Sequence, residues 1–123
     1  MAIETSKGDS AAIHHYWRQQ DQQVLKNVIE KPGPSVLLPN SSTIAVTSQG
    51  KLPLSPKMSS YACNAMVFSD LKSSSSISIN QLCDDNCNVL LNKKKLIVVK
   101  DDGIILQGVQ NFTDGLWDIP VQK

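Results

Sequence analysis

The first segment whose residue types suggest chemistry is an acidic residue followed by a hydroxyl residue and two small residues, Asp9-Ser10-Ala11-Ala12. Small residues permit a tight turn, and such a turn can present a carboxylate while the backbone packs closely. A carboxylate held in this way can accept or donate a proton in catalysis. An Asp-Ser pair is also common in turns and helix caps, so these four residues alone do not define a catalytic site.

Metal binding and serine-based hydrolysis are two further chemistries that the residue types allow. His14, His15, Cys83 and Cys87 are nominal zinc ligands, but adjacent histidines point in different directions and neither pair has the common zinc-finger spacing. Ser10 could be combined with a histidine and an aspartate, but the chain has no Gly-x-Ser-x-Gly turn. We therefore predict no metal site and no cofactor.

Binding to nucleic acid would use the basic run Lys93–Lys95 and the aromatic segment Tyr16–Arg18. The basic run lies between two apolar segments, where a solvated turn is expected, and the aromatic segment follows Asp9 closely and is expected to pack there. The chain has 12 Lys and Arg against 11 Asp and Glu, a net charge of +1, so no overall charge attracts it to phosphates. Nucleic acid is not an expected partner.

The elements that must position these residues are short, because turn-forming residues divide the chain into brief apolar runs. Residues 35–48 are predicted to form a β-hairpin, since Pro39-Asn40-Ser41-Ser42 is typical of a turn and the β-branched residues after it favour a strand. Gly50–Leu54 is predicted to end a ladder, because Pro53 cannot donate a backbone hydrogen bond.

The rest of the chain also predicts a mainly β domain. An Asp-Gly pair at 102–103 between β-branched runs is a strong hairpin signal. Short helices are predicted near residues 77–83 and 21–27. Strands are predicted at residues 61–68, 89–91, 96–99, 104–106 and 116–119.

Length and composition indicate one intracellular domain. The 123 residues correspond to a single domain spanning 1–123. No apolar run approaches the roughly 18 to 20 residues of a membrane helix, and Met1–Lys7 lacks the apolar core of a signal peptide. The three cysteines cannot all pair with one another and are expected to be free thiols of a reducing compartment, the cytoplasm. No membrane partner is expected.

Several segments along the chain match one known pattern in the same order. They are Asp9-Ser10 with Ala12, His15-Tyr16, Leu38-Pro39-Asn40, Gly50, Ile77-Ser78-Ile79-Asn80-Gln81-Leu82 and Gly115-Leu116-Trp117. With these residues the chain resembles the aspartic protease domain of copia-type retrotransposon polyproteins, a branch of the retropepsin-like family. The resemblance covers about residues 8–119, and the block from Ile77 to Leu82 is its most specific part.

The resemblance implies a fold, a dimer and a mechanism. The implied fold is a retropepsin-like closed β-barrel or sandwich with a flap hairpin and one or two short helices. Each chain would contribute one catalytic residue, Asp9, so that a homodimer brings two carboxylates together to share a proton and activate water. The implied substrate is an extended segment of a retrotransposon polyprotein, processed in an intracellular transposon particle without a cofactor.

The resemblance also implies supporting roles for other residues. The active-site loop that braces the two carboxylates would include Ser10, Ala11 and Ala12. The flap that closes over the substrate would include Leu38, Pro39, Asn40, Ser41 and Ser42. The hydrophobic element and short helix beside the catalytic loop would include Ile77, Ser78, Ile79 and Leu82.

The chain departs from the family pattern at two places. The usual glycine is Ala11 here, and a glycine at such a turn often serves unusual backbone angles or the close approach of another chain. The segment Glu4–Gly8 lacks the apolar residues of the strand that often delivers the catalytic aspartate. The alternative prediction is therefore a catalytically inactive retropepsin-like module for dimerisation or peptide binding.

Overall fold

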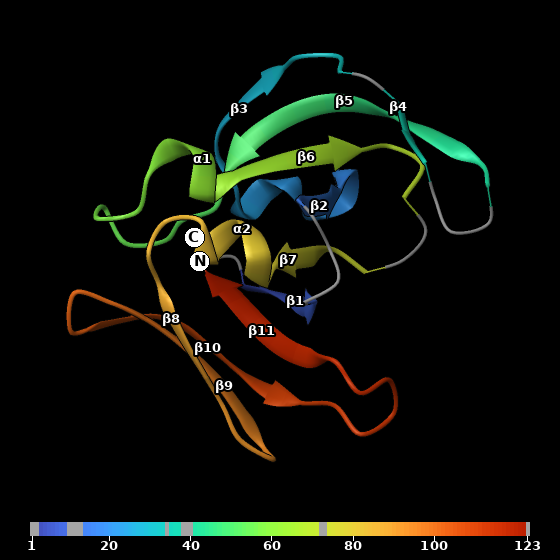
Figure 1. Cartoon of the computed structure of the whole chain (residues 1–123). Coiled ribbons are helices and arrows are strands. Elements are labelled where there is room, and N and C mark those ends of the chain that lie inside the picture. Colours follow the sequence, from blue (N-terminus) through green and yellow to red (C-terminus); the bar gives the residue numbers. More distant parts are fainter. Residues whose placement is uncertain (1–2, 10–13, 34, 38–40, 72–73, 123) are drawn as a thin grey trace.

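Strands dominate the computed structural model, which describes residues 3–9, 14–33, 35–37, 41–71 and 74–122 (Figure 1). The helical elements are the 3-10 helix η1 (Gln19–Val24), α1 (Ser60–Cys63) and α2 (Ile79–Cys83). The strands are β1 (Ile3–Asp9), β2 (His15–Arg18), β3 (Lys26–Glu30), β4 (Ser35–Leu37), β5 (Thr43–Lys51), β6 (Asn64–Phe68), β7 (Ser76–Ser78), β8 (Asn88–Leu91), β9 (Lys95–Lys100), β10 (Gly103–Gln110) and β11 (Trp117–Gln122). The predicted mainly β class is confirmed.

The strands form one open path in the order β3-β5-β6-β2-β7-β1-β11-β10-β9-β8, with β4 added to β5. The closed barrel expected from the sequence is not formed, since no pairing between described residues joins β3 to β8. Closure needs end strands that each bury one face toward a common interior. All five residues of β3 are exposed, and in β8 only Val89 packs against the core while the other three residues are exposed, so β3 has no such face and β8 has little of one.

Strand β1 lies in the middle of this path despite its polar sequence. It is antiparallel to β11 over six residue pairs and parallel to β7 at its end. The Ser6 hydroxyl is buried and donates to the carbonyl of Ile119 at 3.0 Å, and Gly8 lets the Ile119 side chain pack against its backbone. Glu4–Gly8 is polar, as the sequence showed, but it still forms the strand before Asp9, because neighbouring strands supply the hydrogen bonds and the apolar cover.

Two predicted elements are each divided between helix and strand. Residues 61–68 were predicted as a strand, but Ser59 caps α1 by accepting a hydrogen bond from the Ala62 amide, and β6 starts only at Asn64. Residues 77–83 were predicted as a helix, but Ile77 pairs with Gly8 as part of β7. Helix α2 starts at Ile79, where the Ser78 hydroxyl accepts from the Gln81 amide at 3.0 Å.

Local patterns are confirmed where strands follow one another in sequence. The predicted hairpin at 35–48 is present as β4 and β5, in which Val36 pairs with Ile44. The predicted strands after residue 88 correspond to β8, β9, β10 and β11. The turn between β9 and β10 is one residue earlier than expected, since Asp101 and Asp102 have positive φ and Gly103 already pairs with Lys100. The helix predicted near 21–27 is found slightly earlier, as the 3-10 helix η1, because Lys26 and Asn27 already belong to β3.

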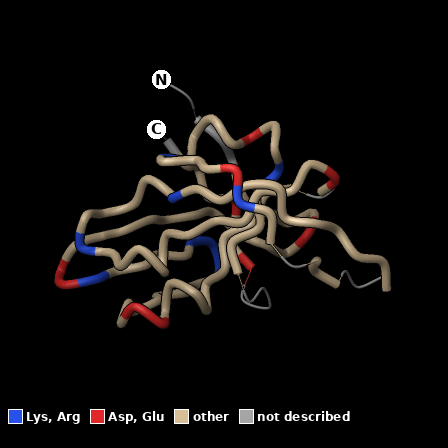
Figure 2. The backbone as a smooth tube through the Cα atoms, turned by 90° about the horizontal axis from the view of Figure 1, so that it is seen from above, with Lys and Arg blue, Asp and Glu red and all other residues tan. Residues whose placement is uncertain are grey.

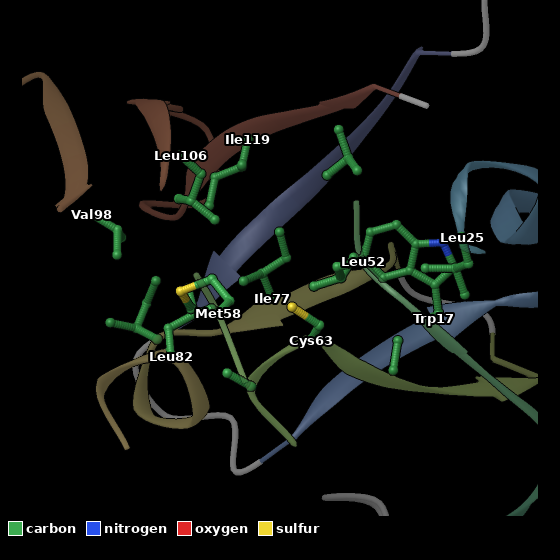
Figure 3. Close-up of a cluster of buried hydrophobic side chains, with 14 of the residues drawn as sticks. Trp17, Leu25, Leu52, Met58, Cys63, Ile77, Leu82, Val98, Leu106 and Ile119 are labelled. Atoms are coloured by element: carbon green, nitrogen blue, oxygen red, sulfur yellow. The ribbon is translucent and has the colours of Figure 1, made fainter. Parts of the chain in front are cut away.

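The hydrophobic core lies beside the central strands and receives residues from both ends of the chain (Figure 3). Trp17, Ile77, Leu82 and Ile119 are among its fully buried side chains.

All three cysteines are free thiols, and Cys83 is exposed whereas the other two are buried. Among the described residues, no helix is long and apolar enough to cross a membrane.

Candidate active site at the end of strand β1

Asp9 is the last residue of β1 and is half-buried. Its backbone lies beside Ser78 of β7 in a parallel register, whereas the pairing of β1 with β11 ends at Gly8. Asp9 borders a shallow depression of about 260 Å³, whose other lining residues are Lys7, Ser74, Ser76, Asp114 and Leu116. The fold therefore presents this carboxylate at the end of a central strand and at the surface.

The structure brings Asp9 next to the predicted supporting segment. Gly8 pairs with Ile77 and Asp9 with Ser78, although these residues are almost 70 positions apart in the sequence. The side chains of Ile77, Ser78 and Leu82 are fully buried, and that of Ile79 is 7% exposed. A buried, hydrogen-bonded segment of this kind can hold the end of β1 in place.

Other predicted site residues are not brought to the depression or lie outside the described residues. Ser10, Ala11 and Ala12 of the active-site loop lie outside them, as do Leu38, Pro39 and Asn40 of the flap. Ser41 and Ser42 are exposed before β5, and Ser41 has a φ of 70°. Neither residue lines the depression that contains Asp9, which is bordered by β1, the segment around β7 and the β10–β11 connection.

A buried polar network next to this site was not assigned a role from the sequence. The imidazole of His15 is fully buried, its Nδ1 accepts a hydrogen bond from the Ser78 amide at 2.8 Å, and its Nε2 lies 2.6 Å from the Ala62 carbonyl. An acceptor at Nδ1 and a carbonyl at Nε2 require the neutral tautomer with hydrogen on Nε2. Burial accordingly lowers the pKa of His15 to about 4.

The side chain of Gln81 completes this network. Its Oε1 accepts from the His15 backbone amide at 2.8 Å, and its Nε2 donates to the carbonyls of Tyr61 and Asn64 at 2.6 and 3.0 Å. Gln81 thereby joins α2 to β2 and to the α1–β6 junction. The only sequence signals for this hydrogen-bond network were the His15-Tyr16 pair and the presence of Gln81 in the block from Ile77 to Leu82. The sequence alone does not show that His15 and Gln81, 66 positions apart, form a hydrogen bond.

An ion-pair cluster that includes Lys7 and Asp114 forms another part of the border of the depression. The Lys7 ammonium contacts the carboxylates of Asp118 and Asp114, the latter at 2.9 Å. Asp118 also accepts from the Asn111 side-chain amide at 3.0 Å. The hydrogen bond to Asp118, followed by that to Asp114, raises the pKa of Lys7, and the same contacts with Lys7 lower the pKa of both aspartates. The cluster fastens the β10–β11 connection to β1.

The segment that carries Ser74 and Ser76 is fixed by a second ion pair. Asp21 is 2% exposed and is held by Arg18, whose Nε and Nη2 donate to its two carboxylate oxygens at 2.7 and 3.1 Å. The Ser75 hydroxyl donates to Asp21 at 2.6 Å and accepts from the Arg18 amide at 2.9 Å. Ser74 and Ser76, which line the depression, flank Ser75 and are therefore held in place by its hydrogen bonds.

The residues that suggested metal or nucleic acid binding lie at several places in the fold. Among the described residues, no three His, Cys, Asp or Glu side chains are grouped so that they could hold a metal ion. Trp17 is fully buried and donates to the Asp21 carbonyl, so it cannot stack on a base. Lys93 and Lys94 lie in an exposed turn before Lys95, the first residue of β9, and the Asn92 side chain accepts from the amides of Lys94 and Lys95. Basic and acidic residues are interspersed along the backbone (Figure 2).

The described site thus consists of a half-buried carboxylate, a buried hydrogen-bonded support and an ion-paired border. Comparison with protein-family models, with curated proteins and with solved structures finds no match to this chain.

Proposed function

We propose that this chain is a retropepsin-like aspartic endopeptidase that acts as a homodimer on a retrotransposon polyprotein. The observation that carries the proposal is the position of Asp9, at the end of a central strand and paired with Ser78 in the block from Ile77 to Leu82. These two segments are the ones that the family resemblance marks as the catalytic loop and its support. The mainly β class with a few short helices supports the proposal as well.

The chemistry follows from two carboxylates that meet at a twofold axis. Two such groups about 3 Å apart cannot both ionise at low cost, so they share one proton. The ionised Asp9 takes a proton from water, whose oxygen attacks the peptide carbonyl carbon, while the protonated Asp9 of the other chain donates to the carbonyl oxygen. The Asp9 that took the proton from water then donates it to the leaving nitrogen, the C–N bond breaks, and the other Asp9 takes a proton from a hydroxyl of the tetrahedral intermediate, which restores the pair.

The substrate would be an extended peptide segment. An extended chain can form backbone hydrogen bonds with strands and with a hairpin that closes over it, and closure excludes water from the reaction. In this proposal the hairpin of β4 and β5 is the flap. The intracellular transposon particle is the proposed location, since the polyprotein would be processed there.

Cleavage assays on the dimeric chain test the proposal directly. The wild-type chain and the Asp9→Asn variant are incubated with a mixed peptide library at pH values from about 4 to 7, and cleavage products are identified by mass spectrometry. We expect cleavage by the wild type and none by Asp9→Asn, because the variant has no carboxylate to activate water. Asp84→Asn is a matched control, since Asp84 is exposed and lies outside the depression.

The second candidate, a catalytically inactive module for dimerisation or peptide binding, is favoured by one observation, the alanine at position 11. If Ala11 needs positive φ, it costs about 1 kcal/mol and displaces the carboxylates. No cleavage by a chain shown to be dimeric would contradict the protease proposal and support this module. Cleavage restored by Ala11→Gly would then identify the methyl group as the cause.

A further inference from the structure

His15 connects the partner strand of Asp9 to the rest of the fold. Because the pairing of β1 with β11 ends at Gly8, the neighbouring strand at Asp9 is β7, and the residue beside it is Ser78. The position of the Asp9 backbone therefore depends on what holds Ser78.

Ser78 is held by the imidazole of His15. Strands β2 and β7 share a single pair, Tyr16 with Ser76, so their backbone pairing does not extend to Ser78. Beyond that pair the Ser78 amide donates to Nδ1 of His15 at 2.8 Å. The ring thus continues the connection between the two strands toward the end that carries Asp9.

The ring itself is rigidly placed. Its Nε2 donates to the Ala62 carbonyl of α1, and the backbone amide of His15 donates to the buried side chain of Gln81. Every polar atom of the side chain has a partner within a fully buried site, which favours a single orientation. A continuous chain of contacts runs from α1 through His15 and Ser78 to Asp9.

From this geometry we infer that His15 is a positioning residue for Asp9, acting through the Ser78 amide. The inference rests on the proposed protease function and adds a specific residue to it. The Nδ1 acceptor is the atom that matters for catalysis, because it faces Ser78. The Nε2 donor faces α1 and anchors the ring. A displacement of the carboxylate by about 1 Å is enough to lower a rate by about 100-fold.

Two substitutions, His15→Asn and His15→Gln, separate the role of Nδ1 from that of Nε2. Asn has its carbonyl oxygen in the place of Nδ1 and can still accept from Ser78, so we expect His15→Asn to keep kcat within about threefold of the wild type. Gln extends toward the position of Nε2 and loses the acceptor at Nδ1, so we expect His15→Gln to lower kcat by about 10- to 100-fold with an unchanged KM. His14→Gln is the matched control, one residue before β2, and should leave both constants unchanged.

The readouts combine kinetics with a direct measure of the Ser78 amide. Circular dichroism and sedimentation first establish that all variants fold and dimerise equally. Hydrogen exchange of the Ser78 amide should be slow in the wild type and in His15→Asn, and faster in His15→Gln. A purely structural role for His15 would instead lower kcat in proportion to lost stability in both variants.

The outcomes distinguish this inference from the proposed function. A folded His15→Gln variant with the kcat of the wild type would overturn the positioning role alone, as would equal losses in the Asn and Gln variants. A dimeric wild-type chain without cleavage that depends on Asp9 would overturn the protease function and the positioning role together.

Discussion

His15 is buried without charge because both ring nitrogens have partners that fit the neutral form. The Ser78 amide needs an acceptor and the Ala62 carbonyl needs a donor, and only the neutral imidazole offers one of each. A second proton would place a donor against the Ser78 amide. Burial opposes the charge as well, since a buried cation loses its hydration. The same bonds that fasten the site therefore make it sensitive to acid.

We expect the stability of the chain to fall in mild acid because of His15. Its pKa is about 4 in the folded chain and about 6.5 when unfolded. As the pH falls from about 6.5 to about 4, the unfolded state takes up the proton first, so the contribution of His15 to stability is lost across this range. The loss is on the order of 3 kcal/mol.

Urea unfolding at pH 7 and at pH 4 measures this effect. The free energy of unfolding should differ less between the two pH values in His15→Asn than in the wild type. Asp85 keeps most of its contribution at pH 4, because its hydrogen bond with Lys100 lowers its pKa from the ordinary 3.8 to about 2, so the contribution is lost mainly below pH 4. An equal acid sensitivity in wild type and His15→Asn would refute the assignment.

At the scale of elements, two glycines allow β11 to pack against its neighbours. A Cβ at Gly8 of β1 would lie 2.8 Å from Cδ1 of Ile119, and one at Gly108 of β10 would lie 2.8 Å from Cγ1 of the same residue. Gly108 also approaches the backbone oxygen of Asp118, which a Cβ would meet at 2.9 Å. Ile119 thus fills the space between two strand backbones, directly behind the strand that carries Asp9.

The glycines of β10 provide a matched pair of substitutions. We expect Gly108→Ala to destabilise the chain by about 1 to 3 kcal/mol, because the Asp118 backbone cannot move away without disturbing β11. Gly103→Ala should change stability by less than about 0.5 kcal/mol, since its Cβ would meet only the Lys100 carbonyl, at an ordinary 3.5 Å. Thermal unfolding compares the melting temperatures of the two variants, and equal melting temperatures would argue against close packing at Gly108.

At the scale of the whole molecule, the open sheet presents one candidate catalytic carboxylate at the end of β1. A mechanism that needs two carboxylates then requires two chains, related by a twofold axis so that the same residue serves both roles. This requirement distinguishes the proposed dimer from a hydrolase that works as a single chain.

Mixing wild type with Asp9→Asn tests this requirement. If equal amounts are unfolded and refolded together, random pairing gives about a quarter of the dimers two wild-type chains. Activity should therefore fall to about a quarter of that of the same total amount of wild type. A fall to only half would show that each chain acts alone, and sedimentation of the mixture confirms that both proteins refold.

The sequence by itself was sufficient for features that depend on neighbours in the chain. The β4–β5 hairpin and strands β8 to β11 were predicted because β-branched runs and turn residues lie within a few positions of one another. The motif at Asp9 and the block from Ile77 to Leu82 were recognised in the same way, as short runs of residue types. The catalytic role of Asp9 stays a prediction for the cleavage assay.

Only the tertiary structure decided the features that depend on distant partners. The polar segment Ile3–Asp9 forms a strand because β7 and β11 border it, and Ile77 belongs to a strand because it pairs with Gly8. Likewise, His15 became part of the candidate site only through Ser78 and Ala62, 63 and 47 positions away. Hydrogen bonding and burial across such separations override local preference, since a central strand satisfies its backbone on both sides whatever its own side chains are.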